Sequence, residues 1–468
     1  MTSLINNLRK GYKYFLIALK GEETEFTTGS INKAIFLLSV PMVLEMIMES
    51  LFAVVDVFFV GKVSVDAVAT VGLTESVVMI VYSIAIGLSM AATAVVARRI
   101  GEKDPKRAGD AAFQSILIAV FMSIVVSVFG IIYAEDILRI MGGTEELIAA
   151  GSGYTRVMLG GNASIMLLFL INGIYRGAGD ASMAMRSLWI ANGLNIVLDP
   201  IFIFGLGPIP AFGVEGAAIA TTIGRSVGVF YQLIGLFGGQ RIIKLTIDNV
   251  KVRLETIRRI FDIALGGMGQ FLIESASWIF LVRIISEFGS AALAGYTIAF
   301  RIIVFTILPS WGMANAAATL VGQNLGAEKP DRAESSVWKT AHLNTGFLFF
   351  VSIIFFWFAP EFVSIFSNEA VVQEHGSMAL RVICVGYITF AYGMVISQGF
   401  NGAGDTKTPV VMNIIFFWFI QIPLAYTLAI HLDYGFFGAM ISVAVAFALH
   451  AAACIYWFRL GKWKLVKV

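Results

Sequence analysis

Twelve long apolar stretches follow one another along this chain of 468 residues. Only 14% of the residues are charged, against roughly 25% in an ordinary soluble domain. A helix needs about 20 apolar residues to cross the ~30 Å hydrocarbon core of a bilayer. The sequence therefore predicts an all-α polytopic protein embedded in the lipid bilayer, with spans near residues 34–60, 67–97, 111–133, 152–175, 183–206, 213–238, 258–286, 291–321, 340–358, 377–400, 409–431 and 436–458.

The chain also repeats itself at a fixed distance. The tetrapeptide Gly-Ala-Gly-Asp ends at Asp180 and again at Asp405, 225 residues later. The same offset places GEKDPKRA (101–108) on GAEKPDRA (326–333). Because six spans return the chain to the same side, we expect two six-helix lobes related by a pseudo-two-fold axis along the membrane normal. Transporters built in this way bind substrate between their lobes and work by alternating access.

The segments outside the spans complete the expected organisation. Lys and Arg gather near both termini and in the even-numbered loops, which the positive-inside rule assigns to the cytoplasm. We therefore expect a multi-pass protein of the cytoplasmic (inner) membrane, with both termini cytoplasmic and no nucleic-acid partner. The expected segments are a cytoplasmic N-terminal segment (1–33), the first lobe (34–238), a cytoplasmic linker (239–257), the second lobe (258–458) and a cytoplasmic tail (459–468).

The N-terminal segment contains a possible amphipathic helix. Apolar residues recur at helical spacing at Leu4, Leu8, Tyr12, Phe15 and Leu19, with basic residues between them. This pattern is typical of a helix that lies on the membrane surface, although a frayed tail gives the same pattern.

The duplication provides an internal comparison between the two halves. Features that both halves keep are expected to serve the fold, such as the Gly-Ala-Gly-Asp turns, in which Asp180 and Asp405 cap the next helix. Polar residues that only the first half keeps are candidates for function. They are Asp56, Tyr154, Asn172, Asn195, Asp199 and Thr221, which align with Leu281, Ala379, Ser397, Ile420, Leu424 and, after a gap of three residues, Val443.

Two of these candidates are carboxylates deep in predicted spans. An ionised carboxylate at mid-membrane costs at least ~2.5–3.5 kcal/mol, so such residues normally face the protein interior and mark ion or proton routes. Asn195 lies one helical turn before Asp199 on the same face. The alternative is that Asp56 and Asp199 only tie helices together through hydrogen bonds.

A second polar group follows the first span. Spacings of four and seven place Glu45, Glu49 and Asp56 on one helix face, which predicts a stripe of carboxylates lining a cavity. In the second half, Gln270 aligns with Glu45 and Glu274 with Glu49, and Trp278 lies one turn after Glu274. These residues would suit a cationic substrate or a second cation, with Trp278 contributing cation–π attraction. Hydration of the glutamates near a helix end, and a lipid-facing Trp278, are the alternatives.

The sequence also resembles a known family. The runs SVPM (39–42), VVDVFFVG (54–61), NGIYRGAGD (172–180), NIVLDPIFIFGLG (195–207) and FGVEGAAIAT (212–221) are similar to the multidrug and toxin extrusion family, and the doubled plan covers nearly the whole chain. The resemblance implies a twelve-helix antiporter that exports organic compounds, often cationic, in exchange for protons or sodium. It implies that the coupling site comprises Asp56, Tyr154, Asn172, Asn195, Asp199 and Thr221. Glu274 matches a glutamate that several branches use for cation coupling or substrate.

The tenth span departs from some branches of that family. It reads RVICVGYITFAYGMVISQGF and contains no carboxylate, with Phe390 near the position where one is expected. Coupling through the first lobe is therefore favoured over a complete sodium site in the second lobe.

The sequence thus predicts a secondary active multidrug efflux antiporter that exports small organic, mainly cationic, compounds and acts as a monomer. The coupling ion is either H⁺ or Na⁺, and Asp56, Asn195 and Asp199 could hold Na⁺. Pro41 is the expected hinge of the first span, and no cofactor, resident metal or catalytic residue is expected.

Two other functions are considered. A flippase for lipid-linked or amphipathic substrates would share the fold but should have a more basic cavity. An enzyme is disfavoured, because the four histidines lie far apart and neither HExxH nor GxSxG occurs.

Overall fold

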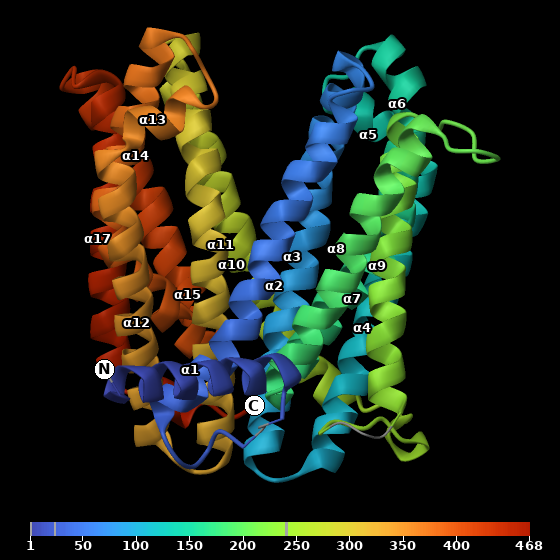
Figure 1. The fold of residues 1–468 in the computed structure, drawn as a ribbon, viewed down its shortest axis with the longest axis vertical. Coiled ribbons are helices and arrows are strands. Elements are labelled where there is room, and N and C mark those ends of the chain that lie inside the picture. Colours follow the sequence, from blue (N-terminus) through green and yellow to red (C-terminus); the bar gives the residue numbers. More distant parts are fainter. Residues whose placement is uncertain (1, 23–24, 239–241) are drawn as a thin grey trace.

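The computed structural model describes residues 2–22, 25–238 and 242–468, and α-helices dominate the fold (Figure 1). The N-terminal half consists of α1 (Thr2–Lys20), α2 (Ile31–Val60), α3 (Val65–Gly101), α4 (Pro105–Ile132), α5 (Ala134–Ile140), α6 (Glu145–Gly160), α7 (Asn162–Ala178), α8 (Ala181–Phe204) and α9 (Val214–Phe237). The C-terminal half consists of α10 (Leu254–Ser286), α11 (Ser290–Gly326), α12 (Pro330–Trp357), α13 (Ala359–Ser364), α14 (Ala370–Ala403), α15 (Lys407–Asn413), α16 (Ile422–Tyr426) and α17 (Gly435–Arg459).

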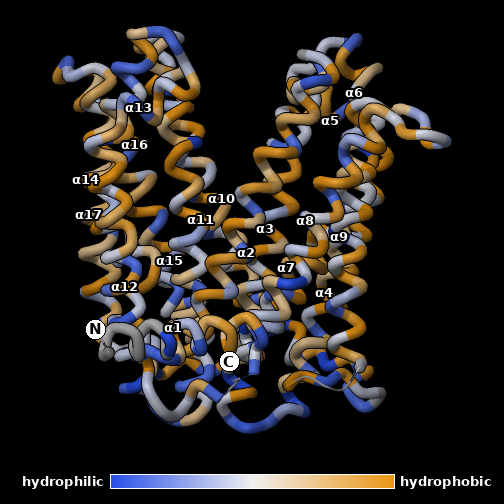
Figure 2. The backbone as a smooth tube through the Cα atoms, viewed as in Figure 1, coloured by the Kyte–Doolittle hydropathy of each residue, from blue (hydrophilic) through white to orange (hydrophobic). Residues whose placement is uncertain are grey.

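These helices account for the twelve predicted spans. Eleven helical segments of the described chain are long and apolar enough to cross a membrane, with α6 and α7 forming one of them. α2 has 30 residues, about 45 Å at 1.5 Å per residue, and provides the remaining span. Figure 2 shows hydrophobic residues over the helices and hydrophilic residues gathered at both ends of the molecule. The predicted twelve-helix membrane fold is confirmed.

The spans divide into two lobes of six, and we call α2–α9 the N-lobe and α10–α17 the C-lobe. The lobes meet at the end of the molecule where both termini lie, and diverge toward the end that carries α5, α6 and α13 (Figure 1). The contacts between them are made largely by α2 and α3 of the N-lobe against α10 and α11 of the C-lobe.

The backbone repeats where the sequence does. Gly179 and Gly404 both end a helix in the left-handed region, with φ of 89° and 88°. Asp180 and Asp405 each accept a hydrogen bond at 3.2 Å from the amide three residues later. The structural interpretation of the two Gly-Ala-Gly-Asp turns is therefore confirmed, because each provides a helix end followed by a side-chain cap.

The eleventh span departs from its counterpart in the first half. α8 is one continuous helix, whereas the segment from Lys407 to His431 includes two π-helical stretches, Ile414–Gln421 and Thr427–His431. The two stretches flank α16, whose second residue is Pro423. The comparison of the two halves did not predict this difference.

The N-terminal segment forms a helix, α1, that contacts α2 and α8. Tyr12 is exposed and Ala18 is buried, while the side chains of Leu4 and Leu8 lie outside the part of the chain that the structure describes. Its location on the membrane surface stays a prediction, as do the segment boundaries given above. The first three residues of the expected linker, 239–241, also lie outside the described residues.

Both ends of the chain bridge the lobes. Arg332 of α12 donates hydrogen bonds to the carbonyl oxygens of Phe26, Thr28 and Gly29, which precede the N-lobe. Arg99 of α3 donates to the carbonyl oxygen of Val468, which follows the C-lobe, at 2.8 Å. The lobes are thus tied together at the end where the termini lie.

Reciprocal glycine contacts bring the lobes together at the same end. A Cβ atom at Gly101 of α3 would overlap the carbonyl group of Gln323 in α11, and a Cβ atom at Gly326 of α11 would overlap that of Arg98 in α3. The four positions are related by the 225-residue offset, so each half contributes the same contact to the other. Only glycine permits this approach of two helix backbones.

We expect Gly101→Ala to hold the lobes apart at this end. Overpacking of a close contact costs about 1–3 kcal/mol, which corresponds to a shift of about 5- to 150-fold in the population of this arrangement. The measurement is the labelling rate of a cysteine introduced at Thr319, a buried residue of the same interface, by a membrane-impermeant thiol reagent.

The matched control is Gly72→Ala, because a Cβ atom at this glycine of α3 would meet nothing within 4 Å. Labelling should be faster in Gly101→Ala than in Gly72→Ala. Equal labelling in the two variants would contradict the assigned role of the glycine contact.

Candidate functional site

Three of the predicted coupling residues form one hydrogen-bonded group between α8 and α9. The side-chain amide of Asn195 donates to Asp199 Oδ1 at 3.2 Å and to Thr221 Oγ1 at 3.0 Å. Asn195 and Asp199 lie one turn apart on α8, and all three side chains are buried. The sequence analysis therefore selected three residues, two from one span and one from the next, that the structure brings together.

Asp56 and Tyr154 lie beside this group. Asp56 of α2 and Tyr154 of α6 are buried and close enough to Asp199 to interact with it electrostatically. Glu75 of α3, which the sequence analysis did not select, also interacts with Asp56. Glu75 aligns with Phe300 at the 225-residue offset, so the comparison of the halves contained the signal.

The group contains acceptors without donors. Asn195 Oδ1 and Asp199 Oδ2 are buried and have no hydrogen-bond partner among the described residues. Unpaired buried oxygen atoms are costly, and oxygen atoms are the ligands that hard cations prefer. The two unpartnered oxygens can therefore accept a proton or bind a cation.

Asn172 belongs to a different group. Its amide donates to Glu45 Oε1 at 3.0 Å, and its oxygen accepts hydrogen bonds from Ser187 and Gln232. Glu45 also forms an ion pair with Arg176 at 3.0 Å, in which both side chains are buried. Asn172 thus positions Glu45, and its hydrogen-bond partners among the described residues do not include Asp56 or Asp199.

Glu49 is also paired with an arginine. Arg225 of α9 lies 3.2 Å from Glu49 Oε1, and Asn192 of α8 donates to Glu49 Oε2 at 2.8 Å. α2 thus aligns Glu45, Glu49 and Asp56 on one face as predicted, and arginines from other helices pair with the first two. A bare pair of carboxylates in the membrane interior would be costly, and the two ion pairs remove that cost.

The sequence analysis missed both arginines, although the duplication indicates them. Arg176 aligns with Asn401 at the 225-residue offset, and Arg225 aligns with Phe447 after the gap of three. Both are thus basic residues of one half only. The candidates selected from the two halves were carboxylates, amides and hydroxyls, and basic residues within the spans were not among them.

A central cavity lies between the lobes. It consists of two adjoining parts of about 290 Å³ and 400 Å³ that share Phe271, Phe300 and Trp311 among their lining residues. Glu49 and Arg176 line the part toward the N-lobe. The predicted substrate residues of the second half, Gln270, Glu274 and Trp278, all line the part toward the C-lobe.

The C-lobe wall of this cavity is aromatic and contains one carboxylate. Trp278 packs against Phe300 with ring centroids 5.1 Å apart. Gln270 donates to Asn401 at 2.9 Å and accepts from it at 3.1 Å, so this pair is mutually satisfied. Glu274 forms no ion pair within the described chain, which leaves its carboxylate available to a ligand in the cavity.

Pro41, the expected hinge, lies inside α2, which continues without a break from Ile31 to Val60. A proline within a helix removes one backbone hydrogen bond and crowds the preceding turn. The adjacent Met42 carbonyl packs against Gly312 of α11. α2 thus has a weakened position directly at its contact with the C-lobe.

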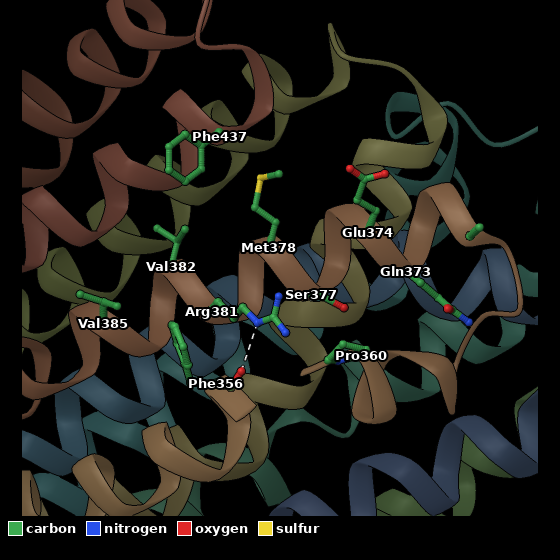
Figure 3. Close-up of a pocket in the computed structure, with 11 residues that line it drawn as sticks. Phe356, Pro360, Gln373, Glu374, Ser377, Met378, Arg381, Val382, Val385 and Phe437 are labelled. Atoms are coloured by element: carbon green, nitrogen blue, oxygen red, sulfur yellow. Dashed lines mark hydrogen bonds between the residues drawn. The ribbon is translucent and has the colours of Figure 1, made fainter. Parts of the chain in front are cut away.

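A separate pocket of about 670 Å³ lies near α13 at the end where the lobes diverge, between α12, α14 and α17 of the C-lobe (Figure 3). Arg381 Nε donates to the carbonyl oxygen of Phe356 at 3.1 Å on its wall, and Glu374 projects near its rim (Figure 3). This pocket contains none of the predicted site residues and no residue of the N-lobe. The central cavity is therefore the candidate substrate site.

Comparison with known proteins agrees with this geometry. The sequence model of the MatE family matches residues 41–201 and 268–427. The chain is 25% identical over 435 residues to a probable multidrug resistance protein, NorM, of Thermotoga maritima, covering 93% of each chain. It is 23% identical over 432 residues to the multidrug export protein MepA of Staphylococcus aureus, covering 92% of this chain and 94% of MepA.

A solved structure shares the whole fold. It is described as the outward-facing conformation of a multidrug resistance MATE family transporter of the MOP superfamily. The TM-score is 0.89 at 28% sequence identity, and the match covers 95% of this chain and 99% of that one. The two family matches fall in the two lobes, in agreement with the internal duplication.

We expect Arg176→Met to destabilise the protein by about 3–5 kcal/mol, because it leaves the buried Glu45 carboxylate without its partner charge. Adding Glu45→Gln should restore most of this loss, since the double variant buries no unpaired charge. The measurement is the unfolding free energy of the purified protein for both single variants and the double variant. A double variant no more stable than Arg176→Met would contradict the assigned ion pair.

Proposed function

This chain belongs to the MatE family of membrane transporters, and from this premise we propose that it is a secondary active multidrug efflux antiporter. It exports organic compounds, cations in particular, in exchange for protons or sodium ions by alternating access. The observation that carries the proposal is the pair of unpartnered buried oxygens, on Asn195 and Asp199, beside the buried Asp56.

In this proposal Asp56 and Asp199 bind the coupling ion. Thr221 and Asn195 fix the orientation of Asp199 through their hydrogen bonds, and Tyr154 closes the group from α6. Entry of the ion from outside is driven by its gradient and by the membrane potential, worth about 2.3 kcal/mol per charge per 100 mV. The same oxygens could accept H⁺ or Na⁺, so the ion is to be identified by measurement.

The proposed cycle couples this site to the opening of the lobes. α2 carries Asp56 and also contacts α11 of the C-lobe, with Pro41 at that contact. Loading of the ion neutralises Asp56, and α2 repacks at Pro41. With both termini cytoplasmic, the end at which the lobes diverge in Figure 1 faces the outside.

The substrate class follows from the central cavity. Its C-lobe wall offers the carboxylate of Glu274 together with the rings of Trp278 and Phe300. A carboxylate attracts a cation, and aromatic faces add about 0.5–2 kcal/mol through cation–π attraction. Aromatic organic cations therefore fit this wall best.

A second candidate function is favoured by one observation. Arg176 lines the cavity on the N-lobe side, and a basic group there would suit the anionic headgroup of a lipid-linked or amphipathic substrate. In that case the protein would act as a flippase of the same wider superfamily. Because Arg176 is already paired with Glu45, the antiporter is favoured.

Asp56→Asn should abolish exchange driven by an ion gradient, because the amide can neither release a proton nor provide the charge that holds Na⁺. The measurement is uptake of a fluorescent organic cation into inverted membrane vesicles under an imposed proton gradient and then a sodium gradient. The gradient that drives uptake in the wild type identifies the coupling ion.

The control is Asp136→Asn, which changes an exposed aspartate at the end where the lobes diverge. It should transport as the wild type does. Driven uptake that survives in Asp56→Asn would contradict the assigned coupling site, and wild type without driven uptake of any cation would favour the flippase.

Glu274→Gln should raise the KM for an aromatic cation such as tetraphenylphosphonium by about tenfold, equivalent to ~1.4 kcal/mol, because the charge opposite the substrate is lost. Glu374→Gln, in the separate pocket of the C-lobe (Figure 3), provides the control. An unchanged KM in Glu274→Gln, measured in the same vesicles, would contradict the assigned substrate site.

A further inference from the structure

Arg225 is a buried cation between the coupling group and the central cavity. It lies one turn after Thr221 on α9, and 1% of its side chain is exposed. Its Nη2 donates both to Glu49 Oε1 at 3.2 Å and to the hydroxyl of Tyr82 at 3.0 Å. Glu49 lines the cavity, so Arg225 reaches the substrate site through this carboxylate.

The guanidinium is incompletely satisfied. Its Nε and Nη1 atoms are buried and have no hydrogen-bond partner among the described residues. A guanidinium has five N–H donors in a planar fork and binds a carboxylate best through two of them. The single nitrogen on Glu49 therefore leaves donors for a second acceptor.

Three aromatic rings surround this charge. The guanidinium carbon lies 5.3 Å from the ring centroid of Phe52 and 5.7 Å from those of Tyr82 and Phe169. Cation–π attraction acts on the charge as a whole. It stabilises the cation at this depth while the N–H groups are able to change partner.

A second acceptor lies on the same helix face as Glu49. Asp56 follows Glu49 by seven residues on α2, about 10 Å along the axis, and Arg225 interacts with it electrostatically. Glu49 of α2 and Tyr82 of α3 contact Arg225 directly, and the groups that act electrostatically on Asp56 are Arg225, Glu75 of α3 and Asp199 of α8. Glu49 pairs with Arg225 directly, and Asp56 is a second carboxylate on the same face of α2.

We propose that Arg225 transmits ion loading to the substrate site by exchanging partners between Asp56 and Glu49. When Asp56 is ionised and empty, the guanidinium turns toward it and leaves Glu49, which is then free to bind a cationic substrate in the cavity. When a proton or sodium ion neutralises Asp56, Arg225 returns to Glu49 and displaces the substrate. The inference rests on the proposed antiport and adds the residue that makes the exchange obligatory.

The surroundings of Glu49 fit both states. Asn192 donates to Glu49 Oε2 at 2.8 Å, so the carboxylate keeps one hydrogen bond after Arg225 leaves. The structure contains the pairing of Arg225 with Glu49, which corresponds to the ion-loaded state that releases substrate. The lobes diverge at the end opposite the termini (Figure 1), where an exporter releases its cargo.

The test is equilibrium binding of tetraphenylphosphonium to the purified full-length protein, at acidic and alkaline pH without sodium, and then with sodium added. In the wild type, loading of the coupling ion should weaken binding by about 5- to 150-fold, the usual range for coupled sites. In Arg225→Met, Glu49 is always free, so probe affinity should equal or exceed that of the ion-free wild type. It should also no longer depend on the ion.

A second variant keeps the proposal testable if Arg225→Met does not fold. Arg225→Met combined with Glu49→Gln leaves no unpaired charge at position 49, and it should also bind the probe without ion dependence, at lower affinity. Arg225→Lys keeps the charge and should retain part of the dependence. The control is the double change Arg253→Met and Asp110→Asn, which removes an ion pair of 2.9 Å outside the site, in which Asp110 is buried, and should keep the full dependence.

The outcomes separate the two proposals. Ion dependence of wild-type size in Arg225→Met, or in the double variant with Glu49→Gln, would overturn the role of Arg225 and leave the antiporter standing. If the affinity of the wild type for the probe depends on neither protons nor sodium, both the proposed function and the role of Arg225 are overturned.

Discussion

The cost of a charge inside the bilayer governs this structure. Each ionised group at mid-membrane costs at least ~2.5–3.5 kcal/mol unless it is paired, and the N-lobe contains several. From the end with the termini outward, Glu45 pairs with Arg176, Glu49 pairs with Arg225, and the group around Asp56 comes last. Among the described residues, Asp56 and Asp199 of this last group form no ion pair, whereas Glu45 and Glu49 each have an arginine. Because arginines pair with the other carboxylates of the N-lobe, the group around Asp56 is the position where a positive charge is still required. A coupling ion can provide that charge.

The duplication explains why the two lobes can differ so much in chemistry. Each half contains the same Gly-Ala-Gly-Asp turn and contributes the same glycine contact between α3 and α11. The features that support the fold are therefore present in both halves. Substitutions that leave this framework intact have made one lobe polar and the other aromatic. Asp56 aligns with Leu281 and Arg225 with Phe447, whereas Trp278 and Glu274 line the cavity from the C-lobe. We infer that the ion and the substrate are bound mainly by different lobes, and that α2 and Arg225 connect them.

The sequence predicted the fold well, because the length of apolar stretches and an internal repeat can be recognised without knowing which helices pack together. It also predicted that Asn195, Asp199 and Thr221 would belong together, since their counterparts in the other half are apolar. It could not predict that Glu45 and Glu49 are neutralised, because the rotation of α7 and α9 about their axes decides whether Arg176 and Arg225 reach α2. The placement of Asn172 on Glu45 depends on the same rotations. Helical periodicity predicts which residues share one face of a helix. It does not predict which side chains of the neighbouring helices contact that face, because this depends on how the helices pack.

The most direct test of the account is the release of the coupling ion when substrate binds. Linkage requires that an ion which displaces substrate be displaced by it in turn. Tetraphenylphosphonium is added to the purified protein in weakly buffered solution, and released protons are measured as a change in pH and released sodium ions with a sodium electrode. The wild type should release one of the two ions, and Asp56→Asn should release neither. Substrate binding without release of either ion, or undiminished release from Asp56→Asn, would contradict coupling through the N-lobe.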